Sequence, residues 1–188
     1  MRIHIDNEAA DLRDELTLYA RRATAVTVAW RVLPLAAGCW FDVETNPLEL
    51  EISWNGGMTG MNTALTSLRD RFTVEPQHGA LRVHHAGRTR RRGEIEVESR
   101  VRVRGGIVCG LRANGALLVR ERPIAFRQRI TTRLGDSLAA AITRGAIEGE
   151  PVDAASVLQE LSPIPLRDTT VTLRGTLEHG YFLREEQR

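Results

Sequence analysis

The stretch EIEVESRVRVRGGIVCGLRANGALLVRER, residues 94–122, decides the fold class that we expect for this chain. In its first half, apolar residues alternate with charged ones, so an extended strand would have one apolar face and one charged face. Gly105-Gly106 and Asn114-Gly115 then follow, and both pairs accept the positive φ angles that tight hairpin turns require. The stretch therefore predicts a β-meander in the middle of the chain.

Strands are predicted on both sides of this meander as well. Alternating or apolar runs bounded by turn residues lie at 2–5, 26–31, 40–44, 48–54, 81–85, 124–130, 169–174 and 181–183. Within residues 94–122 the predicted strands are 94–104, 107–112 and 116–122. Because most of these runs are short and joined by turns, we expect the sheet to be largely antiparallel.

Four further segments favour helices, because their apolar residues recur at helical spacing or their composition suits a helix. They are residues 8–19, 61–72, 137–144 and 154–161. We therefore expect an α+β fold, with a largely antiparallel sheet, a central β-meander, and three or four helices packed on the sheet.

Length and composition indicate one domain spanning residues 1–188. The chain has 188 residues, of which 42% are hydrophobic and 27% charged, as in an ordinary globular protein. No secretory leader or long apolar run is evident, so we expect a cytoplasmic protein with no membrane contact. Cys39 and Cys109 lie among apolar neighbours and are predicted to be buried free thiols, which fits a reducing compartment.

The charges are distributed unevenly along the chain. All 26 basic residues are arginine, and the net charge is +2. Residues 82–133 hold 14 arginines and 4 acidic residues, whereas residues 1–81 hold 7 and 11, and residues 134–188 hold 5 and 9. This basic β-rich centre between acidic flanks indicates either contact with nucleic acid or another polyanion, or acidic flanks that fold back and neutralise the centre within the protein.

The predicted binding site consists of arginines from one loop and one strand of this basic centre. They are Arg88, Arg90, Arg91, Arg92, Arg100, Arg102 and Arg104. Guanidinium groups bind phosphates with two parallel hydrogen bonds, so a row of them suits a nucleic-acid backbone. The alternative is a solvated loop with cross-strand ion pairs, in which Glu94, Glu96 and Glu98 neutralise arginines on neighbouring strands.

The sequence contains no signature of a base-reading module. Phe126 is the one aromatic residue of the basic centre, whereas sheets that bind single strands stack bases on several aromatic rings. If the centre binds nucleic acid, we expect recognition of backbone charge and shape.

No motif predicts catalysis, a metal site or a cofactor. The histidines lack metal-ligand spacing, and the glycine-rich stretch 55–60 lacks the spacing of a phosphate-binding loop. The carboxylate pairs Asp42/Glu44 and Glu49/Glu51 share strand faces, which solvent exposure explains as well as acid–base chemistry does.

The sequence thus favours a nonenzymatic binding protein that engages nucleic acid or another polyanionic partner. The alternative is a structural or assembly subunit of a larger complex, with the basic centre docked on an acidic protein surface or on further copies of the chain. A small enzyme without a recognisable motif is the third hypothesis.

Overall fold

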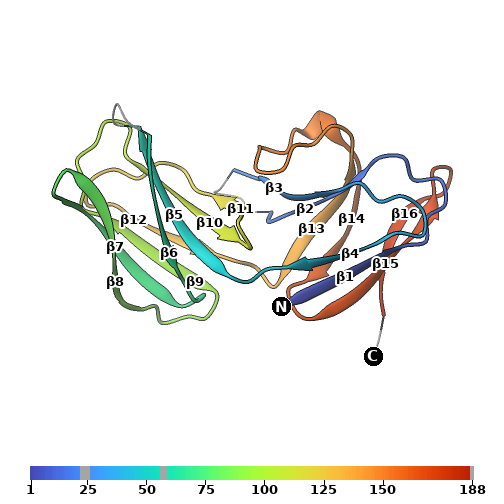
Figure 1. Cartoon of the computed structure of the whole chain (residues 1–188), viewed down its shortest axis with the longest axis horizontal. Coiled ribbons are helices and arrows are strands. Elements are labelled where there is room, and N and C mark those ends of the chain that lie inside the picture. The colour runs from blue at the N-terminus through green and yellow to red at the C-terminus, as the bar shows by residue number, and fades with distance from the viewer. Residues whose placement is uncertain (22–25, 56–58, 187–188) are drawn as a thin grey trace.

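The computed structural model describes residues 1–21, 26–55 and 59–186. Its strands form two lobes that lie side by side (Figure 1). Both ends of the chain belong to one lobe, which we call the terminal lobe, built from the segments 1–47 and 134–188. The segment 48–133 forms the other, the central lobe, and is inserted into the terminal lobe.

The terminal lobe contains two four-stranded sheets, with strand orders β16-β15-β1-β4 and β14-β13-β2-β3. Strands β1 and β15 pair in parallel, and the other pairs are antiparallel. The bounds are β1 Arg2–Asn7, β2 Glu15–Tyr19, β3 Ala29–Leu33, β4 Trp40–Glu44, β13 Ser137–Thr143, β14 Val157–Pro165, β15 Thr169–Thr176 and β16 Gly180–Glu185.

The central lobe repeats this plan with sheets of order β11-β10-β5-β6 and β12-β9-β7-β8. Here β7 and β9 are the parallel pair. The bounds are β5 Leu48–Asn55, β6 Thr59–Leu65, β7 Asp70–Gln77, β8 Ala80–Arg88, β9 Glu94–Ser99, β10 Ile107–Ala113, β11 Ala116–Arg120 and β12 Arg129–Arg133.

Alternation along the strands builds the core. In β9, Ile95 and Val97 are buried while the glutamates between them face outward, and in β1 the same pattern buries Ile3 and Ile5. The buried apolar side chains of the two lobes belong to one continuous cluster.

The lobes are joined by contacts between β3 and β11 as well as by the chain crossings. The Trp30 side chain is fully buried, and its Nε1 donates to the carbonyl oxygen of Ala113 in the central lobe at 3.0 Å. Beside it, the Val26 amide donates to the Arg120 carbonyl at 2.9 Å. A buried hydrogen bond of this kind holds the two lobes in a fixed relation, because breaking it would leave polar groups unsatisfied.

The predicted α+β class is wrong, because the protein is nearly all β. The described residues contain one short 3-10 turn, Ala154–Ser156, and no α-helix. The segments predicted as helices supply β2, β6, the start of β7, β13 and β14. In β13, Leu138, Ala140 and Ile142 are buried at every second position, and hydrogen bonding to β2 and β14 on both sides outweighs the helix propensity of its alanines.

The predicted β-meander is also wrong. The Asn114-Gly115 hairpin is confirmed, with φ angles of 48° and 78°. Gly105-Gly106, however, carries the chain from β9 in one sheet to β10 in the other, so the strands of residues 94–122 do not form one meander. The strand predicted at 94–104 ends at Ser99, and the strand predicted at 124–130 begins only at Arg129.

Candidate polyanion-binding surface

The two lobes carry opposite charge. The segment of the central lobe contains 16 arginines and 8 acidic residues, a net charge of +8. The segments of the terminal lobe contain 10 arginines and 16 acidic residues, a net charge of −6. The basic centre of the sequence therefore lies in a positively charged lobe, and most of the acidic flanks form a negatively charged lobe beside it (Figure 1).

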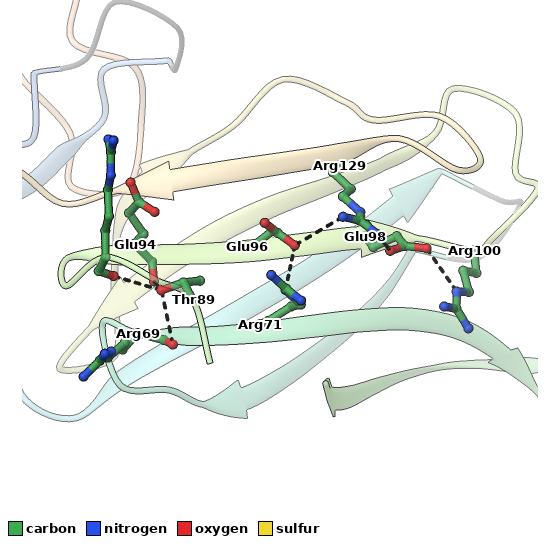
Figure 2. A network of polar contacts seen from close by, with 9 residues as sticks. Arg69, Arg71, Thr89, Glu94, Glu96, Glu98, Arg100 and Arg129 are labelled. Atoms are coloured by element: carbon green, nitrogen blue, oxygen red, sulfur yellow. Dashed lines mark hydrogen bonds and ion pairs between the residues drawn. The ribbon is translucent and has the colours of Figure 1, made fainter. Parts of the chain in front are cut away.

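The outward face of β9 is neutralised by a ladder of ion pairs, and Figure 2 shows those of Glu96 and Glu98. Each of its glutamates lies within ion-pair distance of an arginine: Glu94 with Arg133 at 2.6 Å, Glu96 with Arg71 at 2.8 Å, and Glu98 with Arg129 at 2.8 Å. These arginines lie on β7 and β12, the neighbours of β9 in the sheet. Cross-strand pairing, the alternative expected from the sequence, is thus confirmed on this face.

Arg100, one of the predicted binding residues, belongs to the same network. Its guanidinium contacts Glu75 at 2.8 Å and Glu98 at 3.1 Å. The hydrogen bond from Arg100, with a further one from Arg129, lowers the pKa of Glu98. Arg100 already has two carboxylate partners and is therefore a poor candidate for contact with a ligand.

Most arginines of the central lobe have no such partner. Five of the 16 form ion pairs: Arg71, Arg100, Arg112, Arg129 and Arg133. The remaining eleven have no carboxylate within ion-pair distance among the described residues. In the terminal lobe, by contrast, six of the eight described arginines are paired: Arg2, Arg21, Arg31, Arg144, Arg167 and Arg174. The central lobe therefore presents positive charge that the protein does not neutralise itself.

Five of these unpaired arginines, Arg69, Arg88, Arg90, Arg91 and Arg92, gather at one end of the sheet that contains β9. We call this group the arginine cluster. Arg88 ends β8, the next three arginines lie in the turn between β8 and β9, and Arg69 immediately precedes β7. All five side chains are exposed.

The buried Thr89 side chain fixes the shape of this cluster (Figure 2). Its hydroxyl lies 2.9 Å from the Arg91 carbonyl, 3.2 Å from that of Glu94 and 3.3 Å from that of Arg69. The Thr89 amide donates to the Arg69 carbonyl at 2.7 Å, and the Gly93 amide donates to the Leu68 carbonyl at 2.8 Å. The turn is thereby tied to the segment before β7, which brings Arg69 to the other arginines.

The remaining predicted binding residues lie elsewhere. Arg102 and Arg104 follow β9, whose six residues separate them from the cluster by about 20 Å. The Arg102 guanidinium lies over the Phe126 ring at 4.4 Å, and Arg127 lies over the same ring at 5.1 Å. The structure thus brings together Arg88, Arg90, Arg91 and Arg92, and separates them from Arg100, Arg102 and Arg104.

Arg69 was missed at the sequence level. It lies outside the basic block of residues 82–133, and its place in the cluster depends on the hydrogen bonds from Thr89 and on the pairing of β7 with β8. The sequence carries a local signal for neither contact. Only the register of the strands brings residue 69 beside residue 89.

Asp42 and Glu51, one carboxylate of each pair considered for catalysis, have other partners. Asp42 accepts hydrogen bonds from Arg2 and His4, which hold its pKa at about 2, and Glu51 is paired with Arg112. Cys109 is buried, and burial raises the pKa of its thiol to about 12, so it is a poor nucleophile. Cys39 is exposed, so the prediction that both thiols are buried is wrong for Cys39.

Within the described ranges, no three His, Cys, Asp or Glu residues gather in a way that could hold a metal ion. No helix in the described part of the chain is long and apolar enough to cross a membrane. Residues 56–58 of the glycine-rich stretch 55–60 lie outside the described residues. Comparison of the chain with protein-family models, curated proteins and solved structures found no match.

Proposed function

We propose that the protein is a nonenzymatic nucleic-acid-binding protein that holds phosphate groups with the arginine cluster. The observation that carries the proposal is the contrast in pairing between the lobes. Six of the eight described arginines of the terminal lobe are paired, whereas eleven in the central lobe have no carboxylate within ion-pair distance among the described residues. Unpaired guanidinium groups release bound counterions from a nucleic acid when they contact its phosphates, which is the main source of sequence-independent affinity.

The mode of binding that this surface supports is recognition of the backbone. The arginine cluster contains no aromatic residue, and the Phe126 ring at the far end of the sheet is already covered by two guanidinium groups. Phosphate contacts position a protein on nucleic acid without reading its bases. We therefore expect affinity that depends strongly on salt and weakly on sequence.

The test is titration of labelled single- and double-stranded DNA and RNA with the protein between about 50 and 200 mM salt. In the Arg88→Ala, Arg90→Ala, Arg91→Ala, Arg92→Ala variant, we expect affinity at low salt to fall at least tenfold. The slope of log K against log salt should shrink by about one for each phosphate contact that is lost.

A matched control removes the same charge from the other lobe. Arg13, Arg21, Arg167 and Arg184 are exposed arginines of the terminal lobe, and their replacement by alanine changes the net charge of the protein equally. The proposal requires this control to retain most of the affinity. Equal losses in the two variants would mean that net charge alone drives binding, and no binding at low salt would overturn the proposal.

A second candidate function, assembly of copies of this chain, is favoured by the opposite charge of the two lobes. The central lobe of one copy is electrostatically complementary to the terminal lobe of another, and such an unlike pairing of surfaces propagates head to tail. Oligomers that form without nucleic acid at low salt would support assembly over nucleic-acid binding.

A further inference from the structure

A cleft of about 600 Å³ lies where the two lobes meet. Both chain crossings border it, one at Thr45 to Leu48 and the other at Leu134 to Asp136. The central lobe contributes Ser67 to Arg69 together with Arg88, Arg92 and Gly93. Three members of the arginine cluster, Arg69, Arg88 and Arg92, therefore form one rim of a cleft that the sequence did not reveal.

The lining of this cleft has two chemical parts. Aliphatic side chains supply most of its apolar surface: Met1, Leu48, Leu68, Leu134 and Leu166. Arg69, Arg88 and Arg92 supply the positive charge, and none of them has a carboxylate within ion-pair distance among the described residues. Asp136 also lines the cleft and is the one acidic side chain among the described residues there.

We propose that this cleft binds an organic phosphate with an aliphatic body. The planar guanidinium groups of Arg69, Arg88 and Arg92 match the geometry of phosphate oxygens, and the leucines offer an apolar surface for an alkyl chain. The volume is within the range of small-molecule sites. A nucleobase is disfavoured as the body, because none of the described residues that line the cleft is aromatic and could stack on it.

The walls of the cleft are fixed before a ligand arrives. The Gly93 amide donates to the Leu68 carbonyl at 2.8 Å, and the Leu134 amide donates to the Gly93 carbonyl at 3.1 Å. These bonds connect the cluster with the second chain crossing, and Trp30 fixes the lobes on the β3/β11 side. A preformed site loses less conformational entropy on binding.

The experiment is isothermal titration calorimetry of the full chain with octyl phosphate below its micelle concentration, compared with inorganic phosphate and with octanol. Octyl phosphate is expected to bind at least tenfold more tightly than either. If inorganic phosphate binds as tightly as octyl phosphate, the cleft binds only the phosphate group, and the proposal that it also holds an aliphatic body is overturned. Absence of octyl phosphate binding would overturn all of it.

Four variants assign the binding to this cleft. Arg69→Ala with Arg88→Ala should abolish it. Gly135→Leu should weaken it at least tenfold by filling the cleft, since Gly135 is not in the left-handed region and a Cβ there has room. Asp136→Asn should tighten binding several-fold, because it removes a negative charge beside the phosphate. Arg90→Ala with Arg91→Ala should leave it unchanged, because neither side chain lines the cleft.

The same variants separate this proposal from the proposed nucleic-acid binding. Gly135→Leu should keep affinity for nucleic acid, and Arg90→Ala with Arg91→Ala should lower it while retaining octyl phosphate. If Gly135→Leu leaves octyl phosphate binding intact, the ligand lies outside the cleft and the inference fails, whatever the outcome for nucleic acid.

Discussion

Two adjacent glycines at the crossing between the sheets of the central lobe have very different surroundings. Gly105 and Gly106 both have positive φ angles, of 82° and 75°. A Cβ on Gly106 would lie 2.4 Å from the carbonyl oxygen of Ile124, whereas a Cβ on Gly105 would meet nothing within 4 Å. The two positions therefore separate the cost of the backbone conformation from the cost of a steric clash.

We expect Gly105→Ala to lower the free energy of unfolding by about 1 kcal/mol, the usual cost of a left-handed alanine. Gly106→Ala should cost at least about 2 kcal/mol more, because the Ile124 backbone must also move and its hydrogen bonds with Ile107 lengthen. Urea unfolding of the two variants measures the difference. Equal losses would show that the Ile124 backbone adapts freely to the added methyl group.

The outer face of the terminal lobe contains a histidine between two carboxylates. His4 Nδ1 lies 2.8 Å from Asp42, and Nε2 lies 3.2 Å from Asp6. The hydrogen bond to Asp42 is the main cause that raises the pKa of His4 above its ordinary value of 6.5. The protonated ring therefore stabilises the folded state fully below about pH 6.5, and this stabilisation is lost as the pH rises through the higher folded-state pKa.

We expect Asp42→Asn to return the pKa of His4 toward 6.5 and to flatten the dependence of Tm on pH above about 6.5. NMR titration of the imidazole protons gives the pKa directly. Glu44→Gln, on the same strand, serves as the control and should change the pKa of His4 less. A His4 pKa that stays the same in Asp42→Asn would contradict the role of this hydrogen bond.

Strand β9 limits the net positive charge of the central lobe. Its three outward glutamates occupy arginines on β7 and β12 that would otherwise be free. Replacing Glu94, Glu96 and Glu98 with glutamine raises the net charge of the lobe from +8 to +11. Because these pairs are partly exposed, the total loss of stability should be only about 1 to 2 kcal/mol.

We predict that this triple variant binds nucleic acid more tightly than the native protein, with a steeper dependence on salt. The control replaces Glu44, Glu150 and Glu178, exposed glutamates of the terminal lobe, and changes the net charge equally. Filter binding or fluorescence anisotropy over the same salt series compares the three proteins. If the β9 variant gains no more than the control, the freed arginines lie outside the reach of the bound nucleic acid.

Several strands could be predicted from the sequence, whereas the fold class and the way the strands pair could not. The alternation at residues 48–54, and the turn signal Asn46-Pro47 that separates them from residues 40–44, predict two strands that the structure confirms. The alanines of residues 137–144 favour a helix, although Leu138, Ala140 and Ile142 also alternate. Local propensity could not reveal that this segment lies between two strands contributed by distant parts of the chain.

The candidate site was predictable to a similar degree. Arg88, Arg90, Arg91 and Arg92 are neighbours in sequence and remain together in space. Arg100 was included because its charge alternates along a predicted strand, but its pairing with Glu75 depends on a register that the sequence does not contain. The interlobe cleft depends on an insertion topology, which no local pattern encodes.

The whole molecule has a strong separation of charge, with +8 on one lobe and −6 on the other. A polyanion attracts the central lobe and repels the terminal lobe, so it should orient the protein before contact. The same separation makes the protein electrostatically complementary to further copies of itself. A polyanion and a second copy of the protein would therefore compete for the arginine cluster.

We therefore expect the mean mass in solution to rise as salt is lowered and to fall again when nucleic acid is added. Sedimentation velocity measures both changes. The Arg88→Ala, Arg90→Ala, Arg91→Ala, Arg92→Ala variant should gain less mass than the native protein as salt is lowered. A native protein that stays monomeric at low salt would exclude head-to-tail assembly through this surface.

The tryptophan at the junction of the lobes provides an optical signal. Trp30 is fully buried and hydrogen-bonded across the junction, whereas Trp40 is 59% exposed and Trp54 is partly buried. Buried indole emits at shorter wavelength than indole in water, and acrylamide quenches it less. In a variant with Trp40 and Trp54 replaced by phenylalanine, Trp30 would be the one source of indole emission. A change in that emission would report in real time that a ligand in the cleft, or a partner on the arginine cluster, alters the packing of the two lobes.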